Sequence, residues 1–150
     1  MNVLLVEDET HKLDELVKVF HPLDGAKTFQ ARSVRSAIDF FRDGGSVGLM
    51  VLDMSLPTFD IDENESGGTP QPFGGIEILR YLSRISAAIP TIVFTGYPAF
   101  EDDRGIVTLS ALEDEMREEF NNAFLGIVQY SAFSDEWVAK LKAVYFKVKE

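Results

Sequence analysis

Apolar residues follow two alternating patterns along the chain, short unbroken runs and longer stretches with a single apolar face. An unbroken apolar run is typical of a strand that is buried on both sides, as in a parallel sheet. Such runs occupy residues 3–6 and 49–52, largely apolar runs occupy 91–94 and 125–130, and a weaker mixed run occupies 27–31. Apolar residues spaced three or four positions apart follow each run, and this spacing predicts a half-buried helix.

Three of the five predicted helices have recognisable starts. Ser33 is expected to cap the second helix, Ser110 with Glu113 forms a capping-box pattern for the fourth, and Ser134 starts the fifth. The apolar stripe of the first helix is Leu13, Leu16, Val17 and Phe20, and the third helix spans about 76–85. Strands and helices therefore alternate, which predicts an α/β fold: a doubly wound five-stranded parallel sheet with helices on both faces.

Two connections are longer than a strand-to-helix loop normally is. They lie at about 58–74 and 97–109 within what we expect to be a single domain, residues 1–150. The first is rich in acidic residues, glycine and proline. A disordered acidic loop and a partner surface both remain open for this segment, and the pattern slightly favours the loop.

Acidic and hydroxyl side chains follow the predicted strands at one edge of the sheet. Glu7 and Asp8 follow the first strand, Asp53 the third and Thr95 the fourth. Parallel strands bring their carboxyl ends to the same edge, where open α/β sheets bind ligands. Three carboxylates there repel one another without a cation, and hard oxygen ligands suit Mg²⁺. A carboxylate beside such a metal can act as a nucleophile that forms an aspartyl phosphate.

Composition narrows the class of protein. The formal net charge of −11 argues against nucleic acid or an anionic membrane as a direct partner. There is no cysteine, no apolar run of membrane-spanning length, and no basic start typical of a secretory signal. A cytoplasmic location is the economical expectation.

Four segments carry a resemblance to a known family: VLLVEDE at 3–9, VLDMSLP at 51–57, GIEILR at 75–80 and PTIVFTG at 90–96. In this order they resemble the receiver domain of two-component response regulators, over nearly the whole length of the chain. The resemblance implies a flavodoxin-like sheet with strand order 2-1-3-4-5. It also implies a phosphoacceptor rather than an enzyme, with at most self-catalysed phosphorylation and dephosphorylation.

The resemblance assigns a role to each candidate residue. Asp53 is the implied phosphoacceptor, which takes a phosphoryl group from a kinase phosphohistidine. Asp8 and Asp53, with Glu7 acting through water, are implied to hold Mg²⁺, and the backbone carbonyl of Ser55 completes the site. Thr95 is the implied switch hydroxyl.

The implied partners are a histidine kinase or phosphotransfer protein, a downstream effector protein, and a second copy of the chain bound through the last two helices and the fifth strand. Any output domain is expected in another polypeptide or outside residues 1–150.

Two positions depart from the receiver pattern. Receiver domains usually carry a lysine after the fifth strand, where this chain has Ser131, and an aromatic residue three positions earlier, where it has Val128. Tyr130 substitutes for the aromatic residue only in a different strand register. No other lysine or arginine is obviously placed to compensate, and the sequence does not position Arg104.

These departures leave a second hypothesis open, a pseudo-receiver that acts as a protein-interaction module without phosphorylation. A Mg²⁺-dependent phosphatase or nucleotide-binding enzyme is disfavoured. Ser55 stands where haloacid-dehalogenase-type phosphatases need a second aspartate, and the chain has no phosphate-binding glycine loop.

Overall fold

The central element of the computed structural model, which describes residues 1–60 and 71–150, is a five-stranded parallel sheet of order β2-β1-β3-β4-β7. The strands are β1 (Asn2–Val6), β2 (Lys27–Ala31), β3 (Leu49–Leu52), β4 (Thr91–Thr95) and β7 (Phe124–Gln129). Each neighbouring pair in this sheet is parallel. The predicted strand order and the doubly wound fold class are therefore confirmed.

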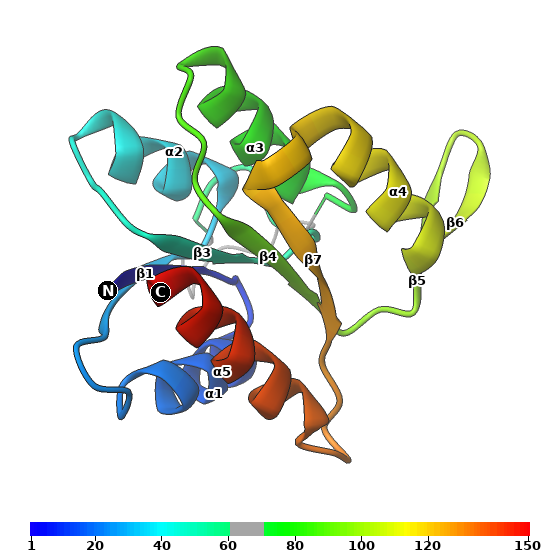
Figure 1. Cartoon of the computed structure of the whole chain (residues 1–150). Coiled ribbons are helices and arrows are strands. Elements are labelled where there is room, and N and C mark those ends of the chain that lie inside the picture. Colours follow the sequence, from blue (N-terminus) through cyan, green and yellow to red (C-terminus); the bar gives the residue numbers. More distant parts are fainter. Residues whose placement is uncertain (61–70) are drawn as a thin grey trace.

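Helices cover both faces of this sheet, as Figure 1 shows. One layer holds α1 (Thr10–Phe20) and α5 (Glu136–Lys149). The opposite layer holds α2 (Val34–Arg42), α3 (Gly74–Arg84) and α4 (Leu109–Phe120). No helix among the described residues is both long enough and apolar enough to cross a membrane.

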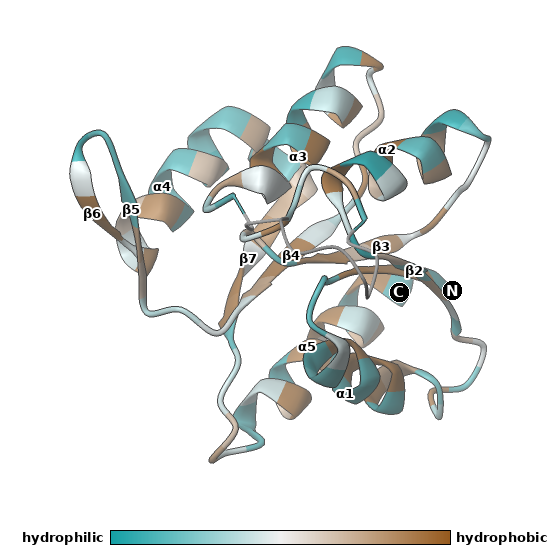
Figure 2. Cartoon of the chain, turned by 180° about the vertical axis from the view of Figure 1, so that it is seen from behind, coloured by the Kyte–Doolittle hydropathy of each residue, from teal (hydrophilic) through white to brown (hydrophobic). Residues whose placement is uncertain are grey.

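The core is divided between the two faces by the alternation of side chains along each strand. Val3 and Leu5 of β1 belong to the apolar cluster beneath α1 and α5. Leu4 and Val6, the alternate residues of the same strand, belong to the cluster beneath α2, α3 and α4. The central strands are accordingly hydrophobic along their length in Figure 2. This two-sided burial explains why β1 and β3 appear in the sequence as unbroken apolar runs.

Two predicted helix caps have different outcomes. Ser33 caps α2 as expected, because its hydroxyl accepts a hydrogen bond from the Ser36 N–H at 3.0 Å. The prediction for Ser110 is wrong, because α4 begins at Leu109 and its cap is Thr108, two residues before Ser110. The Thr108 hydroxyl accepts a hydrogen bond from the Ala111 N–H at 3.1 Å. Both residues are hydroxyl-bearing, and the earlier one ends a strand that the pattern did not reveal.

That strand belongs to a β-hairpin within the connection expected at 97–109. Strands β5 (Ala99–Asp102) and β6 (Gly105–Thr108) pair antiparallel and form a separate two-stranded sheet. Figure 1 shows the hairpin projecting beside α4, away from the central sheet. The other long connection, expected at about 58–74, falls largely on residues 61–70, which lie outside the described residues. Its last residue, Gly74, is already the first residue of α3.

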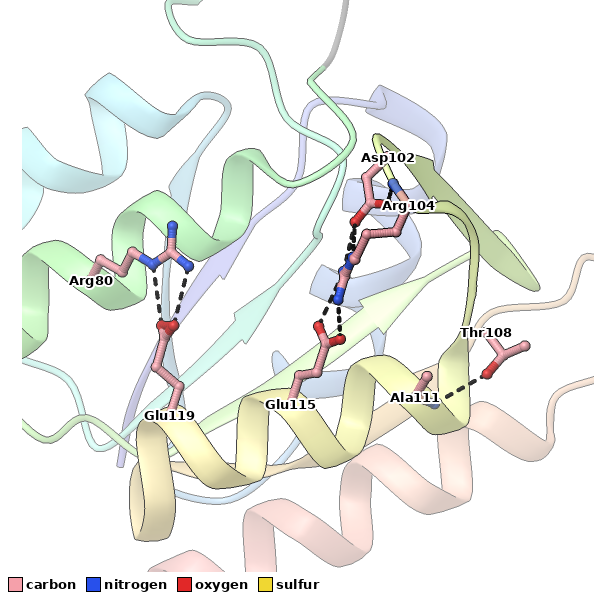
Figure 3. Close-up of polar contacts among 7 residues, drawn as sticks. All are labelled: Arg80, Asp102, Arg104, Thr108, Ala111, Glu115 and Glu119. Carbon is pink, nitrogen blue, oxygen red and sulfur yellow. Dashed lines mark hydrogen bonds and ion pairs between the residues drawn. The ribbon is translucent and has the colours of Figure 1, made fainter.

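Arginine side chains link α4 to α3 and to the hairpin, as Figure 3 shows. Arg104, in the hairpin turn, forms ion pairs with Asp102 and with Glu115 of α4. Arg80 of α3 donates two hydrogen bonds to the carboxylate of Glu119 in α4, at 3.2 and 3.1 Å. The guanidinium of Arg104 is therefore engaged with carboxylates of the hairpin and of α4, away from the acidic strand ends.

Candidate functional site

Three carboxylates meet at the carboxyl ends of β1 and β3. One carboxylate oxygen from each of Glu7, Asp8 and Asp53 can be chosen so that all three lie within 4.8 Å of one another. Glu7 is fully buried and Asp53 is 3% exposed, whereas Asp8 is half-buried. The structure thus brings together the three acidic side chains that the sequence placed at this edge.

The acidic loop after β1 is held in place by a side chain from β2's end. Arg32 donates hydrogen bonds to the carbonyl oxygen of Asp8 at 2.8 Å and to the Thr10 hydroxyl at 2.7 Å. Within the loop, the Glu9 N–H donates to Glu7 Oε2 at 3.3 Å. These contacts fix the backbone from which Glu7 and Asp8 project. The same loop continues directly into α1.

The loop after β3 is equally constrained. The Ser55 N–H donates to Asp53 Oδ1 at 3.3 Å, and the Gly75 N–H donates to the Met54 carbonyl at 2.9 Å. A Cβ on residue 75 would lie 2.6 Å from the Asp53 carbonyl oxygen, which is closer than a side chain can approach. Glycine at 75 therefore lets α3 begin against the backbone of Asp53.

A buried lysine that the sequence analysis did not select also enters the acidic site. Lys12, in the first turns of α1, is only 5% exposed. Its Nζ lies 2.8 Å from Glu7 Oε1 and 3.7 Å from Asp53 Oδ2. The sequence offers no obvious cation for this edge of the sheet, whereas the structure places Lys12 there. One signal was available, because Lys12 stands four residues before the buried Leu16 and so falls on the inner face of the helix.

Aromatic rings flank the other side of this ammonium group. The Nζ of Lys12 lies 5.7 Å from the ring centroid of Phe94 and 5.9 Å from that of Tyr130. These rings contact each other at 5.6 Å between centroids, and both contact Trp137, each at 5.3 Å. A cation within about 6 Å of aromatic faces is attracted by their negative quadrupole. The rings and the carboxylates together hold Lys12 in the site.

Burial and mutual repulsion raise the pKa values of the carboxyl groups in this cluster. Burial, with the nearby Asp53 charge, raises the pKa of Glu7 to about 8, while Lys12 opposes the rise. Burial and the charge of Glu7 raise the pKa of Asp8 to about 6. Burial also raises the pKa of Asp53, against the opposing hydrogen bond with Glu7 and the charge of Lys12. Each of the three carboxyl groups therefore holds its proton more tightly than a carboxyl group in water does.

Thr95 is placed where the sequence expects it, as the fully buried last residue of β4, the strand beside β3. Its hydroxyl accepts a hydrogen bond from the Tyr97 N–H at 3.1 Å. The hydroxyl proton of Thr95 is therefore not used in that bond.

The positions that depart from the receiver pattern lie at and just beyond the end of β7. Val128 is buried in the core beneath α1 and α5. The Ser131 hydroxyl accepts a hydrogen bond from the Phe133 N–H at 3.1 Å, and its carbonyl accepts one from Trp137 Nε1 at 3.2 Å. The Ser131 side chain supplies no charge, so the cation seen in the site comes from α1.

No family model matches the chain. In sequence it is 29% identical over 146 residues to the uncharacterised protein y4jR of Sinorhizobium fredii, with 95% of each chain covered. It is 28% identical over 121 residues to the Detocs response regulatory protein DtcB of Vibrio alginolyticus, covering 79% of this chain and 80% of that protein.

Solved structures give the same picture of the fold. The signal receiver domain of an HD domain-containing protein from Pseudomonas fluorescens Pf-5 matches with a TM-score of 0.66 at 18% identity, covering 99% of this chain and 93% of that chain. A CheY-like response regulator receiver domain protein from Methanospirillum hungatei matches with a TM-score of 0.63 at 15% identity, with the same coverage. The chain has the fold of response-regulator receiver domains.

Proposed function

We propose that this chain, which has the receiver fold, is a receiver domain that accepts a phosphoryl group on Asp53 in a Mg²⁺-dependent phosphorelay. The observation that carries the proposal is the position of Asp53: nearly buried, at the carboxyl end of the central strand β3, within reach of Glu7 and Asp8. Burial of three converging carboxylates is costly unless positive charge meets them. A bound metal ion would supply that positive charge, and it would also favour the binding of a phosphoryl group beside Asp53.

The donor set fits the metal that the receiver fold implies. Carboxylate oxygens from Glu7, Asp8 and Asp53 are hard ligands of the kind that Mg²⁺ prefers, and the half-buried position of Asp8 leaves one side open. Asp8, Asp53 and the backbone carbonyl of Ser55 would hold the ion, with Glu7 acting through water. When bound, Mg²⁺ would neutralise charge on the incoming phosphoryl group.

The chain's own residues account for the remaining steps. The Asp53 carboxylate attacks phosphorus, the new bond to its oxygen forms as the bond to the donor breaks, and the electron pair leaves with the donor. Thr95 would donate a hydrogen bond from its hydroxyl group to a phosphoryl oxygen and so act as the switch. The chain is then a phosphoacceptor, with at most self-catalysed phosphorylation and dephosphorylation.

The proposed partners follow from this chemistry. A histidine kinase or phosphotransfer protein would supply the phosphoryl group, and a downstream effector would bind the phosphorylated form. Two copies would pair through α4, β7 and α5 in a homodimer that gel filtration would detect. The cytoplasm, where such donors work, is the proposed location. The net charge of −11 makes direct binding to nucleic acid unfavourable.

A second candidate function is favoured by one observation. Lys12 already places an ammonium 2.8 Å from Glu7, so the acidic cluster has a built-in counter-ion. In a pseudo-receiver the ammonium of Lys12 would take the place of the metal, and the chain would bind a partner protein without phosphorylation.

Incubation with acetyl phosphate and Mg²⁺, followed by intact-mass measurement, separates the two functions. The phosphoacceptor gains one phosphoryl group, and the gain disappears in Asp53→Asn and in chelator. A chain that gains nothing and binds no Mg²⁺ in a calorimetric titration is the pseudo-receiver.

A further inference from the structure

The side chain of Lys12 occupies an unusual place for a lysine. It is the third residue of a helix whose exposed face carries other charged residues, yet it is 5% exposed and points among the carboxylates. Taking an ammonium group out of water costs free energy, so its burial requires specific compensation. Glu7, Asp53 and the rings of Phe94 and Tyr130 provide that compensation.

We propose that Lys12 supplies the positive charge that binds the phosphoryl group on Asp53, in place of the lysine that the receiver pattern expects at Ser131. The inference rests on the proposed function, because it needs Asp53 to be phosphorylated. It goes beyond that function by assigning the charge to α1, near the start of the chain, instead of to the residue that follows β7.

The geometry around Asp53 distinguishes its two oxygens. Oδ1 accepts the Ser55 N–H, whereas Oδ2 faces the ammonium of Lys12 at 3.7 Å. A phosphoryl group joined to Oδ2 places its own oxygens two bonds further out, on the side where Nζ lies. The ammonium then meets a phosphoryl oxygen without a change of helix position, and charge-assisted hydrogen bonds of this kind are the strong ones.

The surroundings of Lys12 are built to hold that position. Arg32 ties the loop before α1 to the end of β2, so the start of the helix is fixed. The rings of Phe94 and Tyr130 lie against the ammonium, and both contact Trp137. Ser131 meanwhile uses its hydroxyl in a local turn with Phe133. The cation thus comes from α1 and is supported by the aromatic rings. Lys12 thereby takes the place of a lysine after β7.

Phosphoryl transfer with Lys12 in this role balances without any further reactant. The Asp53 carboxylate forms the new oxygen–phosphorus bond as the bond between phosphorus and the acetate oxygen of acetyl phosphate breaks. The electron pair leaves on acetate, and no group is oxidised or reduced. Lys12 keeps its proton throughout, since its part is to neutralise charge on the phosphoryl oxygens.

Binding of beryllofluoride with Mg²⁺, a mimic of the phosphoryl group, tests the proposal without catalysis. Trp137 is the single tryptophan of the chain, and its contacts with Phe94 and Tyr130 make its fluorescence a reporter of the ammonium's surroundings. Lys12→Met is expected to weaken beryllofluoride binding about tenfold or more, as loss of a hydrogen bond from a charged group does. Mg²⁺ binding alone, measured by calorimetry, should persist.

Matched variants distinguish the loss of the positive charge of Lys12 from a general disturbance of the fold. Lys18→Met removes an exposed lysine from the same helix and should leave beryllofluoride binding unchanged. Lys12→Arg should retain part of the affinity, and adding Ser131→Lys to Lys12→Met should recover it by restoring a cation at the usual place. Circular dichroism confirms that each variant is folded, and Lys12→Gln serves if Lys12→Met is not.

The outcomes are distinct. Equal beryllofluoride affinity in wild type and Lys12→Met, with binding lost in Asp53→Asn, would overturn the role of Lys12 and keep the phosphoacceptor. A loss that neither Lys12→Arg nor Ser131→Lys recovers would assign Lys12 a structural role and also overturn the proposal. A wild-type chain that binds no beryllofluoride would overturn both the proposal and the proposed function.

Discussion

Raising the pH of the metal-free protein from about 6 to about 9 tests the charge balance of the acidic pocket. Burial raises the pKa of Glu7 from 4.5 to about 8 in the folded chain. Between those values the folded chain holds a proton that the unfolded chain has lost. A carboxyl group whose pKa is raised by folding stabilises the fold fully below its unfolded pKa, and that contribution is lost as the pH rises through the folded pKa. The free energy of unfolding should therefore fall towards pH 8 and level off above it.

The size of the fall follows from the interval between the two pH values. One proton difference changes the free energy of unfolding by about 1.4 kcal/mol per pH unit, so the loss from about pH 6 to about pH 8 is on the order of 2 kcal/mol. Asp8, with its pKa raised to about 6, loses most of its contribution below this range. The pKa of Lys12 lies above its usual 10.5, because the charges of Asp53 and Glu7 outweigh the opposing effect of burial. Lys12 therefore stays charged in both states.

Urea denaturation at several pH values, with chelator present, measures this fall directly. Glu7→Gln is the control, because an amide does not titrate and the slope between pH 6 and 8 should flatten by about one proton. Added Mg²⁺ should raise the stability of the wild type most at high pH, where the ionised carboxylates bind it best. A pH slope that is unchanged in Glu7→Gln would refute the assignment of the raised pKa to Glu7.

Two further predictions concern residues that position the site. Gly75→Ala should lower the free energy of unfolding by about 1–3 kcal/mol in urea denaturation, because the added Cβ would meet the Asp53 carbonyl oxygen at 2.6 Å; an unchanged midpoint would contradict this close approach. Arg32→Gln should weaken Mg²⁺ binding about tenfold in calorimetry, as loss of a side chain that supports a ligand loop does, whereas the exposed Arg35→Gln should not. Equal affinities in the two variants would contradict a positioning role for Arg32.

Most of the sheet could be predicted because its strands are buried on both faces. The runs at 3–6 and 49–52 contain only apolar residues, and the strand ends then place Glu7, Asp8 and Asp53 at one edge. The cap at Ser33 was predicted because its hydroxyl stands directly before an amphipathic stretch. Packing against a common sheet leaves little freedom in these elements, so local pattern and final structure agree.

The hairpin between β4 and α4 could not be predicted from periodicity. Its strands are only four residues each: Ala99–Asp102 mixes acidic with apolar side chains, and Gly105–Thr108 has two apolar side chains between a glycine and a threonine. Gly105, whose φ is +100°, was the available sign of a tight turn. Because the hairpin ends at Thr108, the helix cap moved away from Ser110.

The cation of the site was missed because a lysine in a helix is normally assigned to the solvated face. The spacing to Leu16 indicates the inner face of the helix, but only the tertiary structure shows that Lys12 reaches Glu7 and Asp53 and that Arg104 is engaged elsewhere. The resemblance directed attention to the end of the fifth strand, whereas the charge arrives from the first helix. The roles of Asp53, Thr95 and the metal ligands stay predictions, which chemistry on the protein must test.

The central claim is that Asp53 carries the phosphoryl group, and chemical mapping of the modified residue tests it most directly. An aspartyl phosphate is reduced by borohydride to the alcohol homoserine, whereas a free carboxylate is not. After treatment with acetyl phosphate and Mg²⁺, then borohydride, peptide mass spectrometry should find homoserine at position 53 and nowhere else. Homoserine at another position, or unaltered Asp53 in a chain that has gained a phosphoryl group, would contradict the account.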